Sequence, residues 1–348
     1  MKTIDLRRLA SSREVTLCRD EGYFPVLVGP RATEILAVVR GGAAHVGVTG
    51  RLDALRSSDG GLTWSRPAVI VQSEADDRNP AVGIAPDGTV VLAYHQQASY
   101  DERGRWAAGL SHVEMRVTWS RDGGATWEPY RPLGFAPMAK YSAYGHIVNL
   151  ADGTMLLPIY GRPHGGEKEP DESSLLRSRD NGRTWAEPSV IAKGHNEAAL
   201  LVLPGGDVLA AIRVDDRNQP LAVCRSSDGG HTWTKPALVT SASEHPADLT
   251  VLSNGWVLMV FGVRHEPFGV QALLSKDGGH SWDRRRLVVC DDLGPNDLGY
   301  PSTVRMGNRL VTAYYCAPGR WNDPEFRGEG SFARALLYDE GEFISALS

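Results

Sequence analysis

The sequence has few of the features that mark membrane, disulfide-rich or nucleic-acid-binding proteins. Its 348 residues include four cysteines, at positions 18, 224, 290 and 316, without the close spacing of a zinc knuckle or a disulfide framework. No stretch reaches the ~20 apolar residues of a membrane-spanning helix, and the first residues contain no apolar signal segment. The formal net charge of −5 argues against nucleic acid or an anionic membrane as the main partner. We therefore expect a cytoplasmic protein, or a secreted one if a signal peptide has been removed.

What the chain does contain is an abundance of turn-forming residues between apolar runs. It has 38 glycines and 21 prolines, and 42% of its residues are hydrophobic. Glycine and proline separate many short strand-like segments, which is typical of an all-β chain. No stretch rich in glycine, serine or proline divides the sequence. We therefore predict one domain over residues 1–348 with a sizeable core.

A short turn motif occurs five times. Its first copy is Ser57-Ser-Asp59-Gly-Gly-Leu-Thr63-Trp64, and the shared pattern is S-x-D-x-G-x-[ST]-W. The aspartate can accept bonds from nearby backbone N–H groups, the glycine supplies a positive φ, and we expect the tryptophan to pack against the next repeat. We interpret the motif as structural rather than catalytic. Its aspartates are Asp59, Asp122, Asp180, Asp228 and Asp277, which are 63, 58, 48 and 49 residues apart. A period near 50 residues indicates a solenoid, propeller or array.

A second pattern, out of phase with the first, consists of two apolar runs joined by a glycine-containing turn. Such pairs predict β-hairpins. Six of them occur, over residues 24–39, 82–94, 147–160, 198–212, 249–261 and 304–315. Six hairpins and five boxes predict an all-β, six-bladed β-propeller with four antiparallel strands per blade, in which the box joins the third and fourth strands. We expect the N-terminal segment to add an outer strand to the last blade and close the ring.

The ends of the six hairpins should converge on one rim of the propeller, because each first strand starts where the second strand ends. Second strands end at or near Arg40, Arg162, Arg213 and Arg264. Further polar residues at these ends are Asp77, Arg78, His146, Glu197 and Tyr300. Clustered arginines suit an anionic or polyhydroxylated ligand, since guanidinium binds carboxylate through two parallel hydrogen bonds. This rim is the predicted ligand site.

Five copies of the box resemble the Asp-box (BNR) repeat of the sialidase, or neuraminidase, superfamily. The stretch from Gly194 to Arg213 is similar to the sialidase segment that carries the catalytic glutamate and the second arginine of a carboxylate-binding triad. Arg264 is placed like the third arginine, and Gly299-Tyr300-Pro-Ser-Thr looks like the segment with the nucleophilic tyrosine. The resemblance implies that Tyr300 is the nucleophile and Glu197 its base. It also implies a set of substrate-binding residues: Arg40, Arg78, Asp77, His146, Arg213 and Arg264.

The chemistry of a tyrosine and glutamate pair matches one class of substrate. A sialoside carries a carboxylate on its anomeric carbon, which repels a carboxylate nucleophile but not a neutral phenol. The phenol, with an ordinary pKa of about 10, needs a base such as glutamate. Sialidases are for this reason an exception to the two-carboxylate rule of glycosidases. We therefore expect an exo-glycoside hydrolase that releases a terminal sialic or related ulosonic acid from a glycan, with no metal and no cofactor.

Three features depart from the sialidase pattern. Tyr23 stands where the first triad arginine is expected, and the segment from Ala313 to Cys316 lacks the glutamate that would pair with it. No aspartate follows Arg40 at the place of the general acid, and we expect His45 to serve instead. These departures leave open a lyase or another exo-glycosidase acting on uronate- or arabinose-type glycans, and a non-catalytic glycan-binding propeller.

Overall fold

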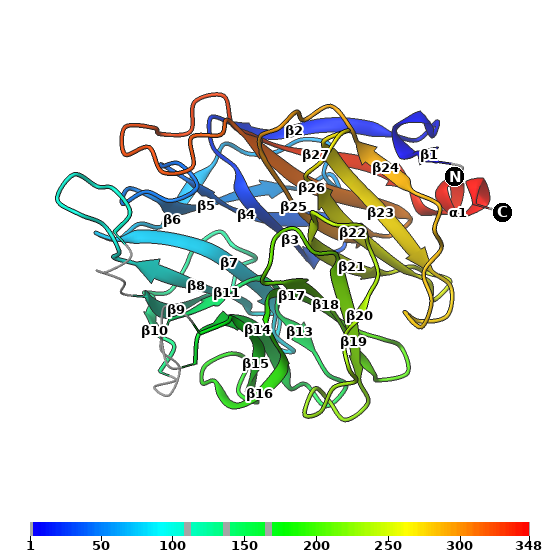
Figure 1. Ribbon diagram of the computed structural model, residues 1–348, viewed down its shortest axis with the longest axis horizontal. Helices are drawn as coiled ribbons and strands as arrows, with labels where there is room; N and C mark the ends of the chain where they lie inside the picture. Colours follow the sequence, from blue (N-terminus) through cyan, green and yellow to red (C-terminus); the bar gives the residue numbers. More distant parts are fainter. Residues whose placement is uncertain (1–2, 108–112, 135–139, 164–168, 348) are drawn as a thin grey trace.

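Six small β-sheets surround a common centre in the computed structural model, which describes residues 3–107, 113–134, 140–163 and 169–347 (Figure 1). The sheets are antiparallel apart from two short parallel additions, β1 and β12. Inner strands of consecutive blades contact one another around the ring. The predicted all-β, six-bladed propeller is confirmed. None of the helices in the described ranges is long and apolar enough to cross a membrane.

Blades 1 to 3 each run from an inner strand near the axis to an outer strand at the perimeter. Blade 1 contains β3 (Tyr23–Arg31), β4 (Glu34–Gly41), β5 (Arg51–Ser57) and β6 (Ala68–Val71). Blade 2 contains β7 (Asp76–Ile84), β8 (Val90–Gln97), β9 (Val113–Ser120) and β10 (Arg131–Pro132). Blade 3 has a divided inner strand, β11 (Tyr141–Ala143) and β13 (Val148–Asn149), followed by β14 (Met155–Gly161), β15 (Glu172–Ser178) and β16 (Ala186–Lys193). Between its two halves, β12 (Gly145–His146) pairs with β7 instead.

The remaining three blades are continuous. Blade 4 contains β17 (His195–Val202), β18 (Val208–Val214), β19 (Leu221–Ser226) and β20 (Ala237–Leu238). Blade 5 contains β21 (Glu244–Val251), β22 (Val257–Val263), β23 (Gly269–Ser275) and β24 (Leu287–Cys290), with β1 (Ile4–Asp5) at its outer edge. Blade 6 contains β25 (Asp297–Met306), β26 (Arg309–Ala317), β27 (Phe332–Asp339) and, as its outer strand, β2 (Arg13–Arg19). The 3₁₀ helix η1 (Leu6–Arg8) follows β1, and helix α1 (Glu340–Ala346) follows β27.

The two ends of the chain are joined in blade 6. β2 pairs with β27 in antiparallel register from Arg13 opposite Leu337 to Arg19 opposite Phe332. The first and last segments of the chain lie side by side there (Figure 1). This pairing covers the backbone groups of β27 that would otherwise form an open edge.

The core is divided among the blade interfaces. Of the seven buried apolar clusters in the described residues, six each combine residues from two consecutive blades, and the seventh gathers rim aromatics such as Tyr23, Phe24 and Tyr300. One example joins Leu36 and Val38 of blade 1 to Val90 and Leu92 of blade 2, all fully buried. Alternate residues of a strand point to opposite faces, so each sheet can pack against both neighbours. The four cysteines are free thiols buried in these layers.

Each box forms the turn between the third and fourth strands of its blade, as predicted. In the first copy, Asp59 Oδ1 accepts bonds from the backbone N–H groups of Leu62 and Thr63, both at 2.9 Å, and Oδ2 accepts the Thr63 hydroxyl at 2.6 Å. These bonds lower the pKa of Asp59 to about 2. Gly61 has a φ of +92° and lies against Val311 of blade 6, where an added Cβ would be 3.2 Å from a methyl group.

The boxes pack against the preceding blade, and the prediction that their tryptophans would contact the next one is wrong. Trp119 of blade 2 donates to the carbonyl of Gly182, which belongs to the box of blade 3. Trp185 of that box lies in the cluster between blades 2 and 3. The direction of the contact depends on how one blade is stacked on another, which no local motif specifies.

The serine that opens each box provides a stability test. Ser57 is 3% exposed, and its hydroxyl accepts the Gly61 N–H at 2.8 Å. We expect Ser57→Ala to lower the free energy of unfolding by about 1–3 kcal/mol, because the buried N–H loses its acceptor. Chemical denaturation measures this difference. Ser58→Ala, in the exposed next position of the same turn, is the matched control, and an equal effect of both variants would contradict this role of Ser57.

Candidate functional site

The site residues come from inner strands that lose register near one rim. Bulges interrupt the pairing of the first two strands in blades 1, 2, 4, 5 and 6. A bulge turns residues out of the ladder and re-aims their side chains. In three blades a residue with positive φ lies at the bulge and precedes a proline, namely Phe24 (φ 53°), Asn79 (φ 50°) and Tyr300 (φ 46°). Because this conformation costs a non-glycine residue on the order of 1–3 kcal/mol, its repetition marks the rim as a functional region.

Three of the predicted site residues meet through short hydrogen bonds. The phenol of Tyr300 donates to Glu197 Oε1 at 2.5 Å, and Arg213 Nη1 donates to Glu197 Oε2 at 2.7 Å. Glu197 lies at the bulge of β17, Arg213 near the end of β18, and Tyr300 at the bulge of β25. Glu197 is 4% exposed and Tyr300 is 7% exposed, so both are largely removed from water.

The pKa shifts of Glu197 and Tyr300 place the proton of their hydrogen bond on Tyr300. Burial raises the pKa of Glu197, but the charge of Arg213 and the hydrogen bonds from Tyr300 and Arg213 together leave it below its ordinary value. Burial, followed by the charge of Glu197, raises the pKa of Tyr300 well above its ordinary value. At neutral pH Glu197 is therefore ionised and Tyr300 is protonated. A carboxylate base in contact with a phenol is the arrangement that activates a tyrosine nucleophile.

Two further arginines approach Tyr300. Arg264 Nε and Nη2 donate to the backbone carbonyls of His245 and Leu298, at 3.2 and 2.8 Å, and its guanidinium carbon is 5.8 Å from the centre of the Tyr300 ring. Arg78 lies 6.0 Å from the centre of the Phe24 ring. Arg213 keeps a buried Nε that has no partner among the described residues. Because guanidinium carries five N–H donors, donors remain for a ligand.

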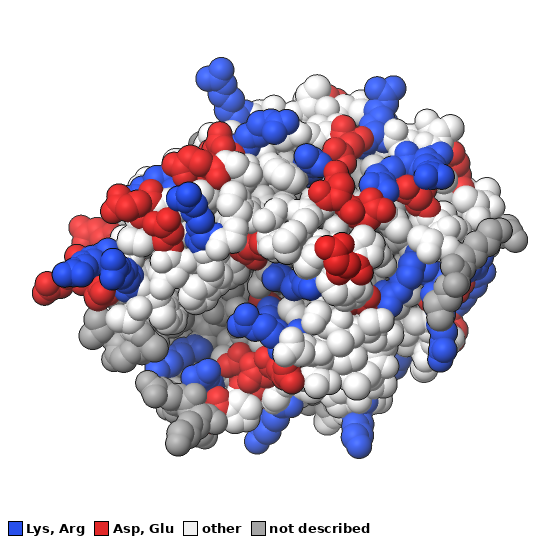
Figure 2. All heavy atoms as spheres, turned by 45° about the horizontal axis from the view of Figure 1, so that its top comes forward, with Lys and Arg blue, Asp and Glu red and all other residues white. Residues whose placement is uncertain are grey.

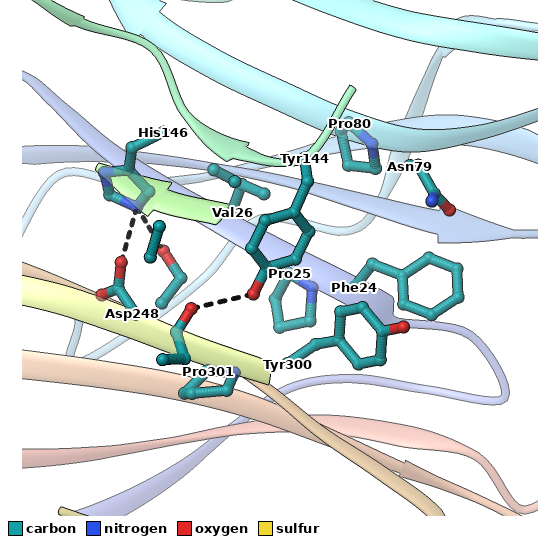
Figure 3. A pocket seen from close by; sticks show the side chains of 14 residues that line it. Phe24, Pro25, Val26, Asn79, Pro80, Tyr144, His146, Asp248, Tyr300 and Pro301 are labelled. Atoms are coloured by element: carbon teal, nitrogen blue, oxygen red, sulfur yellow. Dashed lines mark hydrogen bonds and ion pairs between the residues drawn. The ribbon is translucent and has the colours of Figure 1, made fainter. Parts of the chain in front are cut away.

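The face of the molecule in Figure 2 is hollowed near its middle, and basic and acidic side chains lie together at the edge of the hollow. Figure 3 shows the floor of the aromatic region, where Tyr144, Tyr300 and Phe24 lie around a small cavity of about 10 Å³. The Tyr144 hydroxyl donates to the carbonyl of Ala247 at 2.9 Å, which ties blade 3 to blade 5. No motif in the sequence around Tyr144 indicates this bond.

Comparison with known proteins places the chain in a family. The BNR repeat-like domain family matches residues 34–312, which is most of the chain. The chain belongs to the BNR-repeat proteins of the sialidase superfamily. Among curated proteins it is similar to a sialidase of Paraclostridium sordellii, 21% identical over 191 residues, and to a sialidase of Clostridium perfringens, 21% identical over 184 residues. These matches cover 48% and 46% of this chain, and only 45% and 46% of the two sialidases.

Solved structures extend the likeness over nearly the whole propeller. A protein of unknown function from Dyadobacter fermentans is 26% identical with a TM-score of 0.78, covering 95% of this chain and 100% of that one. The Trypanosoma rangeli sialidase in complex with the inhibitor DANA is 13% identical with a TM-score of 0.70, covering 96% of this chain and 60% of that one. At 13% identity the second likeness shows the fold alone.

Arg40 of this BNR-repeat protein is not placed to bind substrate, contrary to prediction. Its side chain is fully buried, and Nη2 lies 2.7 Å from Asp76 Oδ1, whose side chain is also fully buried. Its Nη1 donates to the carbonyls of Ala43 and Ala44. Asp76 accepts the Gly47 N–H at 3.2 Å and the Tyr100 hydroxyl. The ion pair therefore holds the 42–50 loop, which contains His45.

Two other predicted ligand residues of this BNR-repeat protein, Asp77 and His146, are bonded to neighbouring side chains. Asp77 bonds the backbone N–H and the hydroxyl of Ser73, at 2.7 and 3.0 Å, because neighbouring strand residues point to opposite faces and Asp76 takes the rim-facing position. His146 Nε2 bonds the Ser302 hydroxyl at 2.8 Å and lies 3.8 Å from Asp248. His146 lines the same small cavity as Tyr144 and Tyr300 (Figure 3), and it also lines a separate, broader depression.

Aromatic residues occupy the position where the superfamily resemblance places an arginine and its glutamate. Tyr23 is 1% exposed, and its ring centre is 5.1 Å from that of fully buried Tyr315. Tyr315 donates to Asp297 Oδ1 at 2.8 Å. A packed pair of tyrosines, of which Tyr315 is hydrogen-bonded to Asp297, therefore fills this side of the site in place of a buried ion pair.

His45 contacts a carboxylate that sequence reasoning missed. Its Nδ1 lies 2.6 Å from Asp297 Oδ2, and Arg264 Nη1 lies 3.8 Å from Asp297 Oδ1. Asp297 is 252 residues away in sequence and three residues before Tyr300, at the first position of β25. In the sequence, the position of Asp297 at the start of a strand and close to Tyr300 could have indicated that it belongs to the site. No group of three or more metal-binding side chains lies together in the described part of the chain.

Removing the buried arginine separates a structural role from a ligand-binding one. We expect Arg40→Met to lower the free energy of unfolding by about 3–5 kcal/mol, since it leaves Asp76 buried without its main partner. The surface pair of Arg31 and Glu34 offers the control, because the Arg31 side chain is 59% exposed and Arg31→Met should cost less than ~1 kcal/mol. Denaturant unfolding of both variants measures these two losses in the free energy of unfolding. An Arg40→Met protein of unchanged stability but weakened ligand binding would restore the original assignment.

Proposed function

We propose that this protein is a glycoside hydrolase that releases a terminal acidic sugar, sialic or a related ulosonic acid, through a tyrosine nucleophile. The observation that carries the proposal is the 2.5 Å hydrogen bond from Tyr300 to an ionised Glu197. A neutral phenol can approach an anomeric carbon that bears a carboxylate, which an anionic nucleophile cannot do as easily. The superfamily membership and the sialidase relatives support the same class of chemistry.

The proposed chemical steps use Tyr300 and Glu197, with arginines to hold the substrate. The Tyr300 oxygen bonds to the anomeric carbon and its proton passes to Glu197. The bond from that carbon to the leaving-group oxygen breaks with its electron pair on the oxygen, which takes up a proton. Water then displaces Tyr300 and gives up a proton in turn, while Tyr300 regains its own proton from Glu197. Arg213 and Arg264 hold the substrate carboxylate, with Arg78 at the edge of the same cluster. Among the relatives, the Trypanosoma rangeli sialidase is known in complex with sialic acid and as a covalent intermediate with 2,3-difluorosialic acid.

A lyase acting on a uronate is the second candidate. The observation in its favour is a partly buried His45 whose Nδ1 bonds Asp297 and whose Nε2 has no partner among the described residues. Burial lowers the pKa of His45 despite the opposing effect of Asp297, so the ring is neutral at neutral pH. A neutral imidazole beside tyrosine and arginine can remove a proton next to a carboxylate.

Turnover of aryl glycosides tests the proposed function. We expect wild-type protein to release 4-nitrophenol from the α-ketoside of N-acetylneuraminic acid, and Tyr300→Phe and Glu197→Gln each to lower kcat/KM by about 100-fold or more, the order of magnitude of losing a nucleophile or its base. The control Tyr130→Phe changes an exposed tyrosine on the outer side of blade 2 and should leave activity unchanged. Activity that survives in Tyr300→Phe would rule out the nucleophile, and an unsaturated product from a uronate polymer would favour the lyase.

The acid side of the pH profile follows from Glu197. Only the ionised carboxylate can accept the phenol proton, and its pKa lies below the ordinary 4.5. Activity should therefore persist as pH falls to the lowered pKa of Glu197, and it should be lost only below that pKa, where the carboxylate is protonated. A plot of kcat/KM against pH measures this limb. An activity lost already between pH ~7 and ~6 on the acid side would contradict Glu197 as the base.

A further inference from the structure

A histidine and a carboxylate form a second proton-transfer pair in the site, apart from Tyr300 and Glu197. His45 Nδ1 and Asp297 Oδ2 are 2.6 Å apart, with side chains 16% and 12% exposed. The other oxygen of Asp297 accepts the Tyr315 hydroxyl at 2.8 Å. Because a carboxylate accepts from Nδ1–H, the Nε2 atom is the one left to exchange a proton.

The backbone that carries His45 is held from several sides. On the N-terminal side of His45, Arg40 donates to the carbonyls of Ala43 and Ala44. On its C-terminal side, Asp76 accepts the N–H of Gly47. The N–H of Val46 donates to the carbonyl of Trp321 at 3.1 Å. Ala43, Ala44 and Val46 are at most 2% exposed. A side chain on a loop fixed in this way keeps its orientation, which proton transfer requires.

His45 and Tyr300 share one aromatic neighbour. The Phe24 ring centre is 4.9 Å from the centre of the His45 ring and 4.8 Å from that of Tyr300. A sugar lying over Phe24 can therefore contact the nucleophile at one side and the imidazole at the other. Because both groups lie against the Phe24 ring, Tyr300 can reach the anomeric carbon while His45 reaches the leaving-group oxygen of the same glycosidic bond.

We propose that His45 is the catalytic residue that exchanges a proton with the leaving-group oxygen, and that Asp297 is the positioning residue that holds its ring. This inference rests on the proposed hydrolase function. In the first step the imidazolium Nε2–H gives its proton to the glycosidic oxygen, which keeps the electron pair of the broken bond. In the second step neutral Nε2 takes a proton from the water that displaces Tyr300. Asp297 stays ionised throughout and accepts the Nδ1–H bond.

The charges around His45 decide its pH range. Burial lowers the pKa of His45, Asp297 raises it, and Arg78 and Arg40 lower it again. The Phe24 and Trp321 rings also pack near His45, and the charge of Arg40 is itself paired with Asp76. Burial raises the pKa of Asp297, but His45, Arg264 and Tyr315 together bring it down to about 2. An acid of lowered pKa is protonated only at mildly acidic pH, so activity that needs it falls as pH rises through that value.

Leaving-group dependence tests the assignment. The probes are the methyl and the 4-nitrophenyl α-ketosides of N-acetylneuraminic acid, which share one sugar. Methoxide needs a proton to leave and nitrophenolate does not. We expect His45→Gln to lower kcat/KM by about 100-fold or more for the methyl ketoside and by less than about 10-fold for the nitrophenyl ketoside. His280→Gln, an exposed histidine in the fifth box, is the control and should change neither.

The positioning role of Asp297 is tested by the pH dependence of activity, which a loss of packing alone would not change. Asp297→Asn removes the charge that raises the pKa of His45, so the alkaline limb of the methyl-ketoside pH profile should shift to lower pH, with a larger effect on kcat than on KM. Equal losses on both ketosides in His45→Gln, or an unmoved limb in Asp297→Asn, would overturn the inference. If the wild-type protein turned over neither ketoside, the result would instead contradict the proposed function, and with it this proton transfer. An NMR titration then reports whether Asp297→Asn lowers the pKa of His45, and an unchanged pKa would overturn the positioning role as well.

Discussion

Packing between consecutive blades constrains every other feature of this molecule. Each blade buries its apolar side chains against a neighbour, so no sheet could be stable on its own. The ring therefore has to close, and the pairing of β2 with β27 closes it. The site inherits this dependence, because Glu197 belongs to blade 4, Tyr300 to blade 6, and His45 to a loop that leaves blade 1.

The inner strands meet a second constraint where they reach the rim. Strands that converge on an axis leave too little room for a regular ladder to present side chains toward a ligand. Bulges relieve this by turning single residues out of register, and three of them place a residue at positive φ before a proline. The backbone strain at these bulges coincides with the places where a side chain must point into the site. Stability of the ring and function of the rim are thus linked through the same strands.

Most charges at the rim are paired, and the pairing divides their roles. Arg40 and Asp76 neutralise one another out of contact with water and support a loop. Arg213 is paired with Glu197 through Nη1, while its Nε has no partner in the described part of the chain. Where the superfamily resemblance expects the first arginine of the triad, Tyr23 and Tyr315 pack together, and a carboxylate, Asp297, lies beside Arg264. The site is therefore less cationic on that side than a three-arginine site would be.

Local sequence was sufficient to specify the kind of fold and to single out three residues that meet in the candidate site. Five boxes and six hairpins were enough for a six-bladed propeller, because each motif is local: the bonds of Asp59 all lie within four residues. Glu197, Arg213 and Tyr300 were predictable because each lies beside a recognisable hairpin or motif. The roles of Arg40, Asp77 and Asp297 emerged only from the folded molecule. Burial, the facing direction of a strand residue, and a contact across 252 residues depend on how blades pack around the axis, and no short stretch of sequence carries that information.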